Sequence, residues 1–182
     1  MFVSVARSLT AFAFIALLIA SATWYSYAIK GIIGFKNVFV GLWSGLLPWA
    51  AVLDHVIPAA VVPAVVIVAL FVTQKELVAD IHDRIGDASA GVRTIPVVMG
   101  TRAALGFAGA INLLSCLVAT LSDPAPVLVH LARAGQIVAI VNIAGVCLLL
   151  IERSPVAVRG FLELQKVFMI GGCLALFLLI VR

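Results

Sequence analysis

The chain has 182 residues, of which 64% are hydrophobic and 11% are charged, and its mean hydropathy is +1.26. A soluble domain carries about 25% charged and about 45–50% apolar residues. This composition therefore excludes a soluble domain and predicts an integral membrane protein. The formal net charge of +4 does not indicate a nucleic-acid partner, because the basic residues lie mostly in short segments between apolar runs.

Six apolar runs approach the roughly 20 residues that a membrane-spanning helix needs. The first run follows Arg7 and has the outline of a signal peptide, but without a convincing cleavage pattern we interpret it as a spanning helix. The second run contains Gly41, Gly45 and Pro48, and we expect a kinked or tilted helix there. We therefore predict an all-α, multi-spanning transmembrane bundle. Its expected helices cover 8–29, 37–53, 57–79, 101–121, 126–151 and 164–181.

The connecting segments fall into two sets by charge. Most lysines and arginines lie in or beside segments 30–36, 80–100 and 152–163, whereas segments 54–56 and 122–125 contain neither residue type. The positive-inside rule then places the first set on the cytoplasmic side of the cell's inner or plasma membrane. Both ends of this chain are expected on the outer side.

An acidic stripe starts at the cytoplasmic end of the third predicted helix and runs into a cytoplasmic loop. Half of the 8 acidic residues fall within 12 positions, at spacings that place them on one narrow face of a helix. Each pair of like charges at this spacing destabilises a helix by about 0.2–0.5 kcal/mol. A bound multivalent cation would relieve this repulsion. Oxygen ligands alone suit Mg²⁺ or Ca²⁺. The stripe consists of Glu76, Asp80, Asp83 and Asp87.

Arginines accompany the acidic stripe. Arg84, Arg93 and Arg102 lie in or beside the same segment. Metal-bound carboxylates together with guanidinium groups suit a diphosphate, since the metal neutralises its oxygens and arginine binds them in pairs. The alternative is a solvated loop whose charges mark the membrane interface. The spacing on one face favours a metal–diphosphate site.

The segment from Asp80 to Gly100, DIHDRIGDASAGVRTIPVVMG, resembles the second aspartate-rich motif of the UbiA-type membrane prenyltransferases. That motif reads approximately D-I-x-D-x-x-G-D-x-x-x-G-x-x-T-[LI]-P-V-x-x-G. The resemblance is strongest to the branch that contains digeranylgeranylglyceryl phosphate synthases and the chlorophyll or homogentisate enzymes. The matching residues are Asp80, Ile81, Asp83, Gly86, Asp87, Gly91, Thr94, Ile95, Pro96, Val97 and Gly100.

A second stretch, from Trp24 to Gly41, is similar to the family's Y-S-x-x-L-K segment and the G-x-x-N-x-x-V-G start of its next helix. The resemblance implies that Tyr25 and Lys30 lie near the diphosphate and that Asn37 belongs to the same substrate site. Without the resemblance, Lys30 would be interpreted as an anchor at the cytoplasmic interface. The residues that carry this match are Tyr25, Ser26, Lys30, Gly34, Asn37 and Gly41.

The resemblance implies an Mg²⁺-dependent transfer of a prenyl group from a polyprenyl diphosphate to a lipophilic or aromatic acceptor. Asp83 and Asp87 would hold Mg²⁺ with help from Asp80. Lys30 and Arg93 would stabilise the departing diphosphate, and Arg84 would assist in binding it. The substrate's allylic carbocation would form inside an apolar pocket, where the acceptor captures it.

The resemblance covers 1–182 as a single membrane domain, equivalent to the C-terminal two thirds of the family's fold and to the last six of its nine helices. The family's earlier motif, close to N-D-x-x-D-x-x-x-D, has no counterpart, because the first acidic residue here is Asp54. We therefore expect a truncated enzyme, a fragment of a split enzyme, or a catalytically inactive relative. An inactive relative would bind a prenyl lipid or a partner polypeptide, either an N-terminal fragment or another copy of the chain.

A small transporter or channel is disfavoured, because the acidic residues gather at one edge of the membrane rather than at mid-depth. Asn112 and Asn142 are polar residues within the fourth and fifth predicted helices. We expect them to form hydrogen bonds between helices, with a place in the acceptor cavity as the alternative.

Overall fold

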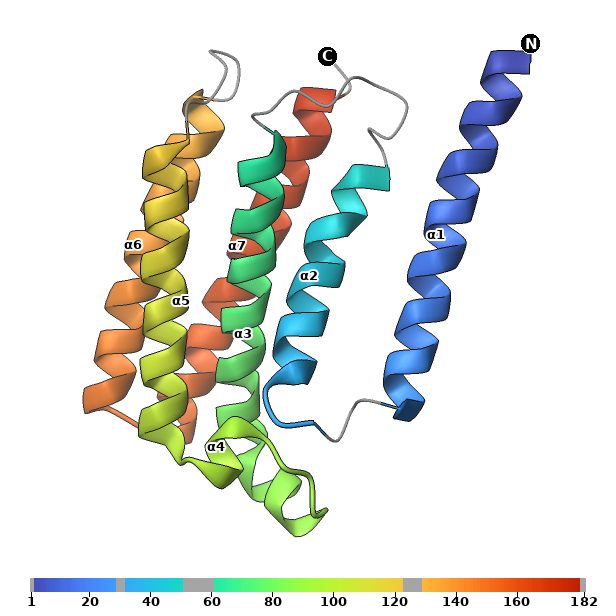
Figure 1. Ribbon diagram of the computed structural model, residues 1–182. Helices are drawn as coiled ribbons and strands as arrows, with labels where there is room; N and C mark the ends of the chain where they lie inside the picture. Colours follow the sequence, from blue (N-terminus) through green and yellow to red (C-terminus); the bar gives the residue numbers. More distant parts are fainter. Residues whose placement is uncertain (1, 29–31, 51–60, 123–128, 181–182) are drawn as a thin grey trace.

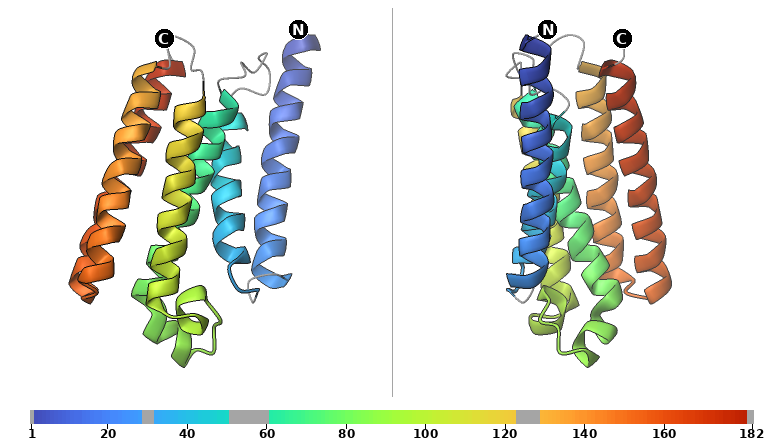
Figure 2. Two further views of the ribbon diagram at one scale, coloured as in Figure 1. Left: turned by 60° about the vertical axis from the view of Figure 1, so that its left-hand side comes forward. Right: turned by 90° about the vertical axis from the view of Figure 1, so that its right-hand side faces the viewer.

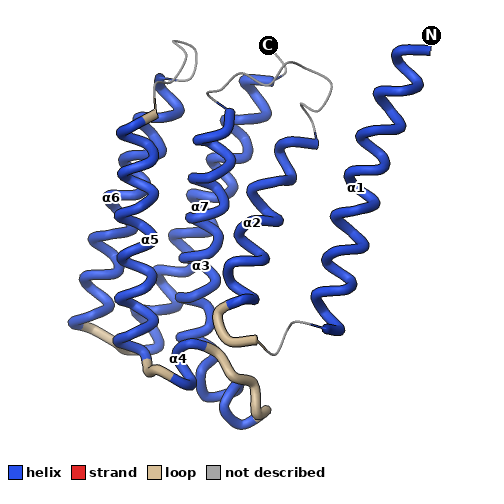
Figure 3. Tube along the Cα trace, viewed as in Figure 1, coloured by secondary structure: helices blue, strands red, loops and turns tan. Residues whose placement is uncertain are grey.

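The computed structural model describes residues 2–28, 32–50, 61–122 and 129–180, and these ranges contain helices and no strands (Figures 1 and 3). The all-α fold class is thereby confirmed. The helices are α1 (Phe2–Ala28), α2 (Phe35–Ala50), α3 (Val61–Ser89), α4 (Ile95–Val98), α5 (Thr101–Leu121), α6 (Val129–Ile151) and α7 (Pro155–Ile180).

The long helices run roughly along one direction. Helices α1, α2, α3 and α5 form a row, and α6 and α7 lie together on one side of it (Figures 1 and 2). Helix α3 packs along both α2 and α5, whereas α1 stands apart and contacts α2. One link between α1 and α2 is the Trp43 indole, which donates to the Leu18 carbonyl at 2.9 Å.

Two helices in the described part of the chain are long and apolar enough to cross a membrane, Val62–Ser89 and Thr101–Leu121. Shorter apolar helices occur at Phe12–Tyr25 and Gly135–Ile151. All of them share the direction of the bundle (Figure 1). A membrane-spanning bundle therefore has its best-supported spans in α3 and α5.

Helix α3 continues beyond its predicted end at residue 79, so the acidic stripe is helical throughout and the expectation of a loop from residue 80 was wrong. The helix ends in a Schellman motif around Gly91, whose φ is +71°. There the Val92 N–H donates to the Asp87 carbonyl at 2.8 Å, and the Gly91 N–H donates to the Ala88 carbonyl at 3.2 Å.

Helix α7 begins at Pro155, well before the predicted start at 164. The Ser154 hydroxyl accepts a hydrogen bond from the Ala157 N–H at 3.2 Å, so serine caps the helix and proline follows in its first turn. Both residue types are typical of helix starts. The prediction failed because the charged residues that follow, Arg159 among them, were interpreted as a loop.

The two glycines of α2, Gly41 and Gly45, allow close packing against α3. A Cβ added at Gly45 would approach the Val65 carbonyl oxygen to 2.8 Å and the Ala69 Cβ to 2.9 Å, and one at Gly41 would run into Thr73. Small residues let membrane helices approach each other in this way. The α2–α3 pair is therefore fixed along its length, which places the start of α2 beside the acidic stripe.

The core lies where α3 meets α5, α6 and α7. Its buried apolar side chains include Leu77, Val78, Leu105 and Phe161. Because Gly145 has no side chain, the Phe161 ring of α7 packs directly against α6.

A buried polar cluster joins three helices within this core. The Gln165 amide of α7 donates to Gln74 of α3 at 2.7 Å and to Asn142 of α6 at 2.8 Å. The predicted interhelical role of Asn142 is confirmed. Asn112 is also buried, but its amide nitrogen has no partner among the described residues, so its role stays a prediction.

Candidate functional site

One end of the bundle gathers the end of α3, the short helix α4, and the starts of α2 and α5 (Figure 1). A pocket of about 200 Å³ lies here, which we call the Asp87 pocket. The turn before α2, the last turns of α3 and the segment after α3 form its walls. Its lining residues are Ile32, Gly34, Lys36, Asn37, Asp87, Val92, Arg93 and Thr94.

Asp80 joins α2 to α3 beside this pocket. Its carboxylate is 1% exposed and accepts hydrogen bonds from the Lys36 ammonium at 2.5 Å and the Asn37 amide at 2.9 Å. Burial alone would lower the pKa of Lys36, which lies in the first turn of α2. The hydrogen bond from Lys36 to Asp80 and the nearby negative charges outweigh burial and raise that pKa. Lys36 is therefore a fixed positive charge at neutral pH.

The acidic stripe is not uniformly bare. Glu76 pairs with Lys75 at 3.2 Å, and Asp80 pairs with Lys36, so the inner half of the stripe is neutralised. Asp83 is 64% exposed at its side chain and contacts the His82 imidazole at 2.8 Å. Asp87 forms no ion pair with any described residue. The outer two carboxylates are therefore those with room for an added cation.

The donor set limits what this part of the chain can bind. Among the described residues, no three His, Cys, Asp or Glu side chains lie close enough together to hold a metal ion. Asp83 and Asp87 offer carboxylate oxygens, which suit Mg²⁺, whereas both oxygens of Asp80 are already engaged. The chemistry of Asp83 and Asp87 thus fits magnesium, but the described residues do not complete its coordination.

Arg93 and Thr94 form the opposite wall of the Asp87 pocket. Arg93 is exposed, whereas Thr94 is 5% exposed and its hydroxyl has no hydrogen-bond partner among the described residues. Gly34 (φ +75°) lies close to the Ile95 side chain, since an added Cβ at Gly34 would lie 3.2 Å from it. The turn before α2 therefore sits directly against α4.

The structure brings only some of the predicted site residues together. Asp87, Asn37 and Arg93 share the Asp87 pocket, whereas Arg84 lines a different one. The Tyr25 ring stacks on Phe39 with centroids 4.5 Å apart and is not part of the pocket lining. Lys30 lies outside the described residues.

Sequence reasoning missed two residues of the pocket, Lys36 and Thr94. Lys36 was counted only as a loop charge, although it directly precedes Asn37, which the family pattern marks. Its 44-residue separation from Asp80 gave no local signal. Thr94 matched the motif, but a hydroxyl without a hydrogen-bond partner becomes visible only in the fold.

Comparison with known proteins identifies the family of the chain. The chain is 33% identical over 126 residues to the digeranylgeranylglyceryl phosphate synthase of Natronomonas pharaonis, a match that covers 68% of this chain and 43% of that protein. The chain thus spans less than half the length of this curated relative. No solved structure matches the chain. The model of the UbiA prenyltransferase family matches residues 1–169, and the chain therefore belongs to this family of integral membrane prenyltransferases.

Proposed function

We propose that this chain forms a single membrane domain of an intramembrane prenyltransferase, which transfers a prenyl group from a polyprenyl diphosphate to a lipophilic or aromatic acceptor. The observation that carries the proposal is the Asp87 pocket. It is lined by a carboxylate and a buried hydroxyl that have no ion-pair or hydrogen-bond partner among the described residues, and by two cationic side chains, at one end of an apolar bundle. The diphosphate would lie in this pocket, and the prenyl tail would extend among apolar side chains.

Asp83 and Asp87 would hold Mg²⁺ against the diphosphate, as the resemblance of the acidic motif implies. When bound, the ion neutralises phosphate oxygens and stabilises the negative charge of the leaving group. Asp80 would act differently from the other two carboxylates, since its oxygens bind Lys36 and Asn37. Its role would be to position these two side chains beside the diphosphate.

Lys36 and Arg93 would bind the phosphate oxygens and stabilise the charge that develops as the carbon–oxygen bond breaks. Tyr25, near the end of α1, and Lys30, outside the described residues, remain proposed contributors. The Thr94 hydroxyl would gain a hydrogen-bond partner when the diphosphate binds, which compensates the cost of burying it unpaired. Arg84 would act from outside this pocket.

We propose that the ligands needed to complete the magnesium site come from a further polypeptide segment. Either a separate N-terminal fragment or another copy of the chain would supply them. The supporting observation is that only Asp87 among the carboxylates lines the pocket, and no three suitable side chains cluster in the part of the chain that is described. The pocket's acidic end would face this segment, on the cytoplasmic side of the membrane.

A direct test is prenyl transfer from a radiolabelled polyprenyl diphosphate in membranes that contain this chain and Mg²⁺. We expect Asp87→Ala to reduce the rate by roughly a hundredfold or more, as loss of a charge-stabilising group does. Glu163→Gln is the matched control, because Glu163 is an exposed carboxylate that pairs with Lys166 on α7. Unchanged transfer by the Asp87→Ala variant would contradict the proposed role.

A second candidate function is non-catalytic binding of a prenyl lipid or a partner polypeptide. The incomplete metal-ligand set among the described residues favours it. In that case the unmutated chain would bind a polyprenyl diphosphate but transfer nothing, even with Mg²⁺. Binding and transfer measured on the same membranes separate the two functions.

A further inference from the structure

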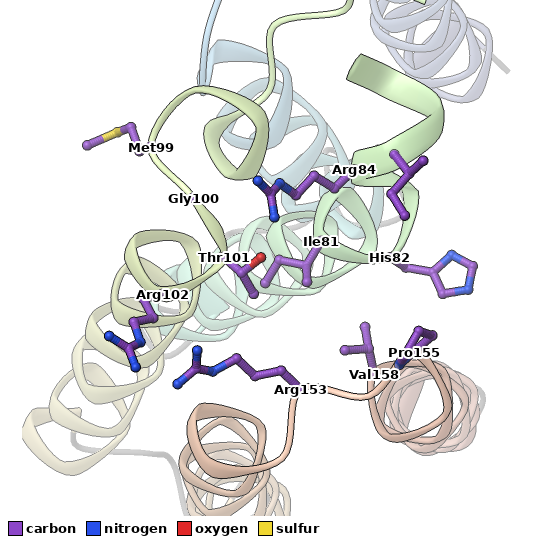
Figure 4. Close-up of a pocket in the computed structure, with 11 residues that line it drawn as sticks. Ile81, His82, Arg84, Met99, Gly100, Thr101, Arg102, Arg153, Pro155 and Val158 are labelled. Carbon is purple, nitrogen blue, oxygen red and sulfur yellow. The ribbon is translucent and has the colours of Figure 1, made fainter. Parts of the chain in front are cut away.

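A second, larger pocket of about 570 Å³ lies at the same end of the bundle, and it shares no lining residue with the Asp87 pocket. Three arginines from three parts of the chain line it, and we call it the triple-arginine pocket (Figure 4). Arg84 comes from α3, Arg102 from the first turn of α5, and Arg153 from the connection between α6 and α7.

The lining of the triple-arginine pocket has no negative charge. It contains no Asp or Glu, and none of the three guanidinium groups forms an ion pair with any residue that the structure describes. Figure 4 shows the Arg102 and Arg153 side chains reaching toward each other and Arg84 reaching toward the segment at Gly100 and Thr101. Like charges that converge on one cavity repel each other, so an anion between them would be stabilised.

Arg153 is held in place at the rim of this pocket. Two nitrogens of its guanidinium group, Nη2 and Nε, donate to the Leu150 carbonyl at 3.0 and 3.2 Å. These bonds use the last turn of α6 and leave other donors of the guanidinium group free, since arginine has five N–H groups. The positive charge at the rim is therefore ordered rather than freely mobile.

The start of α5 adds backbone donors to the same pocket. Gly100, Thr101 and Arg102 all line it, and Gly100 precedes the helix with a φ of +87° and no side-chain cap. The first N–H groups of a helix have no partner within it, and they favour a negatively charged group. Glycine at this position also leaves the backbone accessible, because no Cβ covers it.

We propose that the triple-arginine pocket binds a phosphate group. Guanidinium groups bind phosphate oxygens in pairs, and the helix start supplies further N–H donors. The pocket lies at the end of a membrane bundle, where the phosphate of an anionic lipid headgroup and soluble phosphate can both reach it. This site is separate from the Asp87 pocket, and its occupancy does not require prenyl transfer.

The test measures the thermal unfolding midpoint of the full chain in detergent, titrated with dioctanoyl phosphatidic acid, with inorganic phosphate, or with dioctanoylglycerol. We expect stabilisation by one or both phosphate-bearing probes and none by dioctanoylglycerol, at matched ionic strength. Arg102→Gln combined with Arg153→Gln should weaken the apparent affinity by roughly tenfold or more, because it removes charge-assisted hydrogen bonds. Phosphatidic acid acting alone would identify a lipid headgroup, and equal action of inorganic phosphate would identify a soluble source.

Two control variants make the result specific. Arg159→Gln removes an exposed arginine of α7 that does not line the pocket, and it should leave the affinity unchanged. Arg93→Gln removes the arginine of the Asp87 pocket. If Arg93→Gln abolishes binding while the double variant does not, the phosphate belongs to the Asp87 pocket and the proposal is wrong. Absence of stabilisation by both phosphate-bearing probes would also overturn it.

Discussion

Asp80 shows how a single carboxylate can be part of an acidic motif without being available to a cation. Its two oxygens are bound by Lys36 and Asn37, and it is almost fully buried. Asp83 and Asp87, one and two turns further along α3, have no such lysine partner in the described structure. Within the motif, Lys36 and Asn37 thus engage the Asp80 carboxylate, whereas Asp83 contacts only the His82 imidazole and Asp87 forms no ion pair among the described residues.

The Asp80–Lys36 pair should stabilise the fold far more than an exposed pair does. In a double-mutant cycle with Asp80→Asn and Lys36→Met, we expect a coupling energy of about 1–3 kcal/mol, because the carboxylate is buried and cannot be rescued by water. The measurement is thermal or denaturant unfolding in detergent. The matched cycle at Glu163 and Lys166, an exposed pair at 2.7 Å, should give a much smaller coupling energy, because water screens both charges. Equal coupling in both cycles would show that burial of Asp80 does not matter.

The last turns of helix α3 line both pockets. Asp87 faces one pocket, and Ile81, His82, Arg84 and Ile85 line the other. The Schellman motif at Gly91 ends the helix just after these residues. The turn that ends α3 therefore determines where Asp87 lies relative to Arg93 and Thr94.

Two glycines of this terminus should respond oppositely to alanine. Gly91→Ala should destabilise the chain by about 1–2 kcal/mol, because its φ of +71° is left-handed. Gly86→Ala should stabilise the chain by up to about 1 kcal/mol, since Gly86 is helical and an added Cβ meets nothing within 4 Å. Unfolding midpoints in detergent compare the two variants. A stabilising Gly91→Ala would contradict the proposed role of the motif.

Five basic residues of the bundle lie at one end, as the loop charges predicted. Lys36, Arg84, Arg93, Arg102 and Arg153 all lie near the start of α2, the end of α3 or the start of α5 and α7 (Figure 1). That this end faces the cytoplasm stays a prediction from the positive-inside rule.

Cysteine labelling tests this orientation. A membrane-impermeant maleimide should label Ala88→Cys, which is exposed at the end of α3, only when it has access to the cytoplasmic side. Asp123→Cys, in the predicted outer segment, should be labelled only from the outside. The unsubstituted chain gives the background from its native cysteines. Labelling of Ala88→Cys from the outside would reverse the predicted orientation.

The sequence predicted the long helices well because apolar runs are local patterns. It failed at the boundaries, where charged residues such as Asp83 and Arg159 continue a helix into water and resemble a loop. Asp87 and Arg93 come from the acidic segment and Asn37 from the second stretch that resembles the family, and the three residues line one pocket. The partners of Asp80 and the convergence of Arg84, Arg102 and Arg153 depend on contacts between distant segments, which no local pattern encodes.

The polar cluster of Gln74, Asn142 and Gln165 has a consequence for how the chain assembles during synthesis. Helix pairs such as α2–α3 and α5–α6 can associate as the chain emerges, since their partners are close in sequence. Gln165, however, is 91 residues from Gln74 and arrives last. Until α7 is in place, the Gln74 side-chain oxygen lacks this hydrogen-bond donor. The last helix thereby supplies the amide donor that links Gln74 to Asn142.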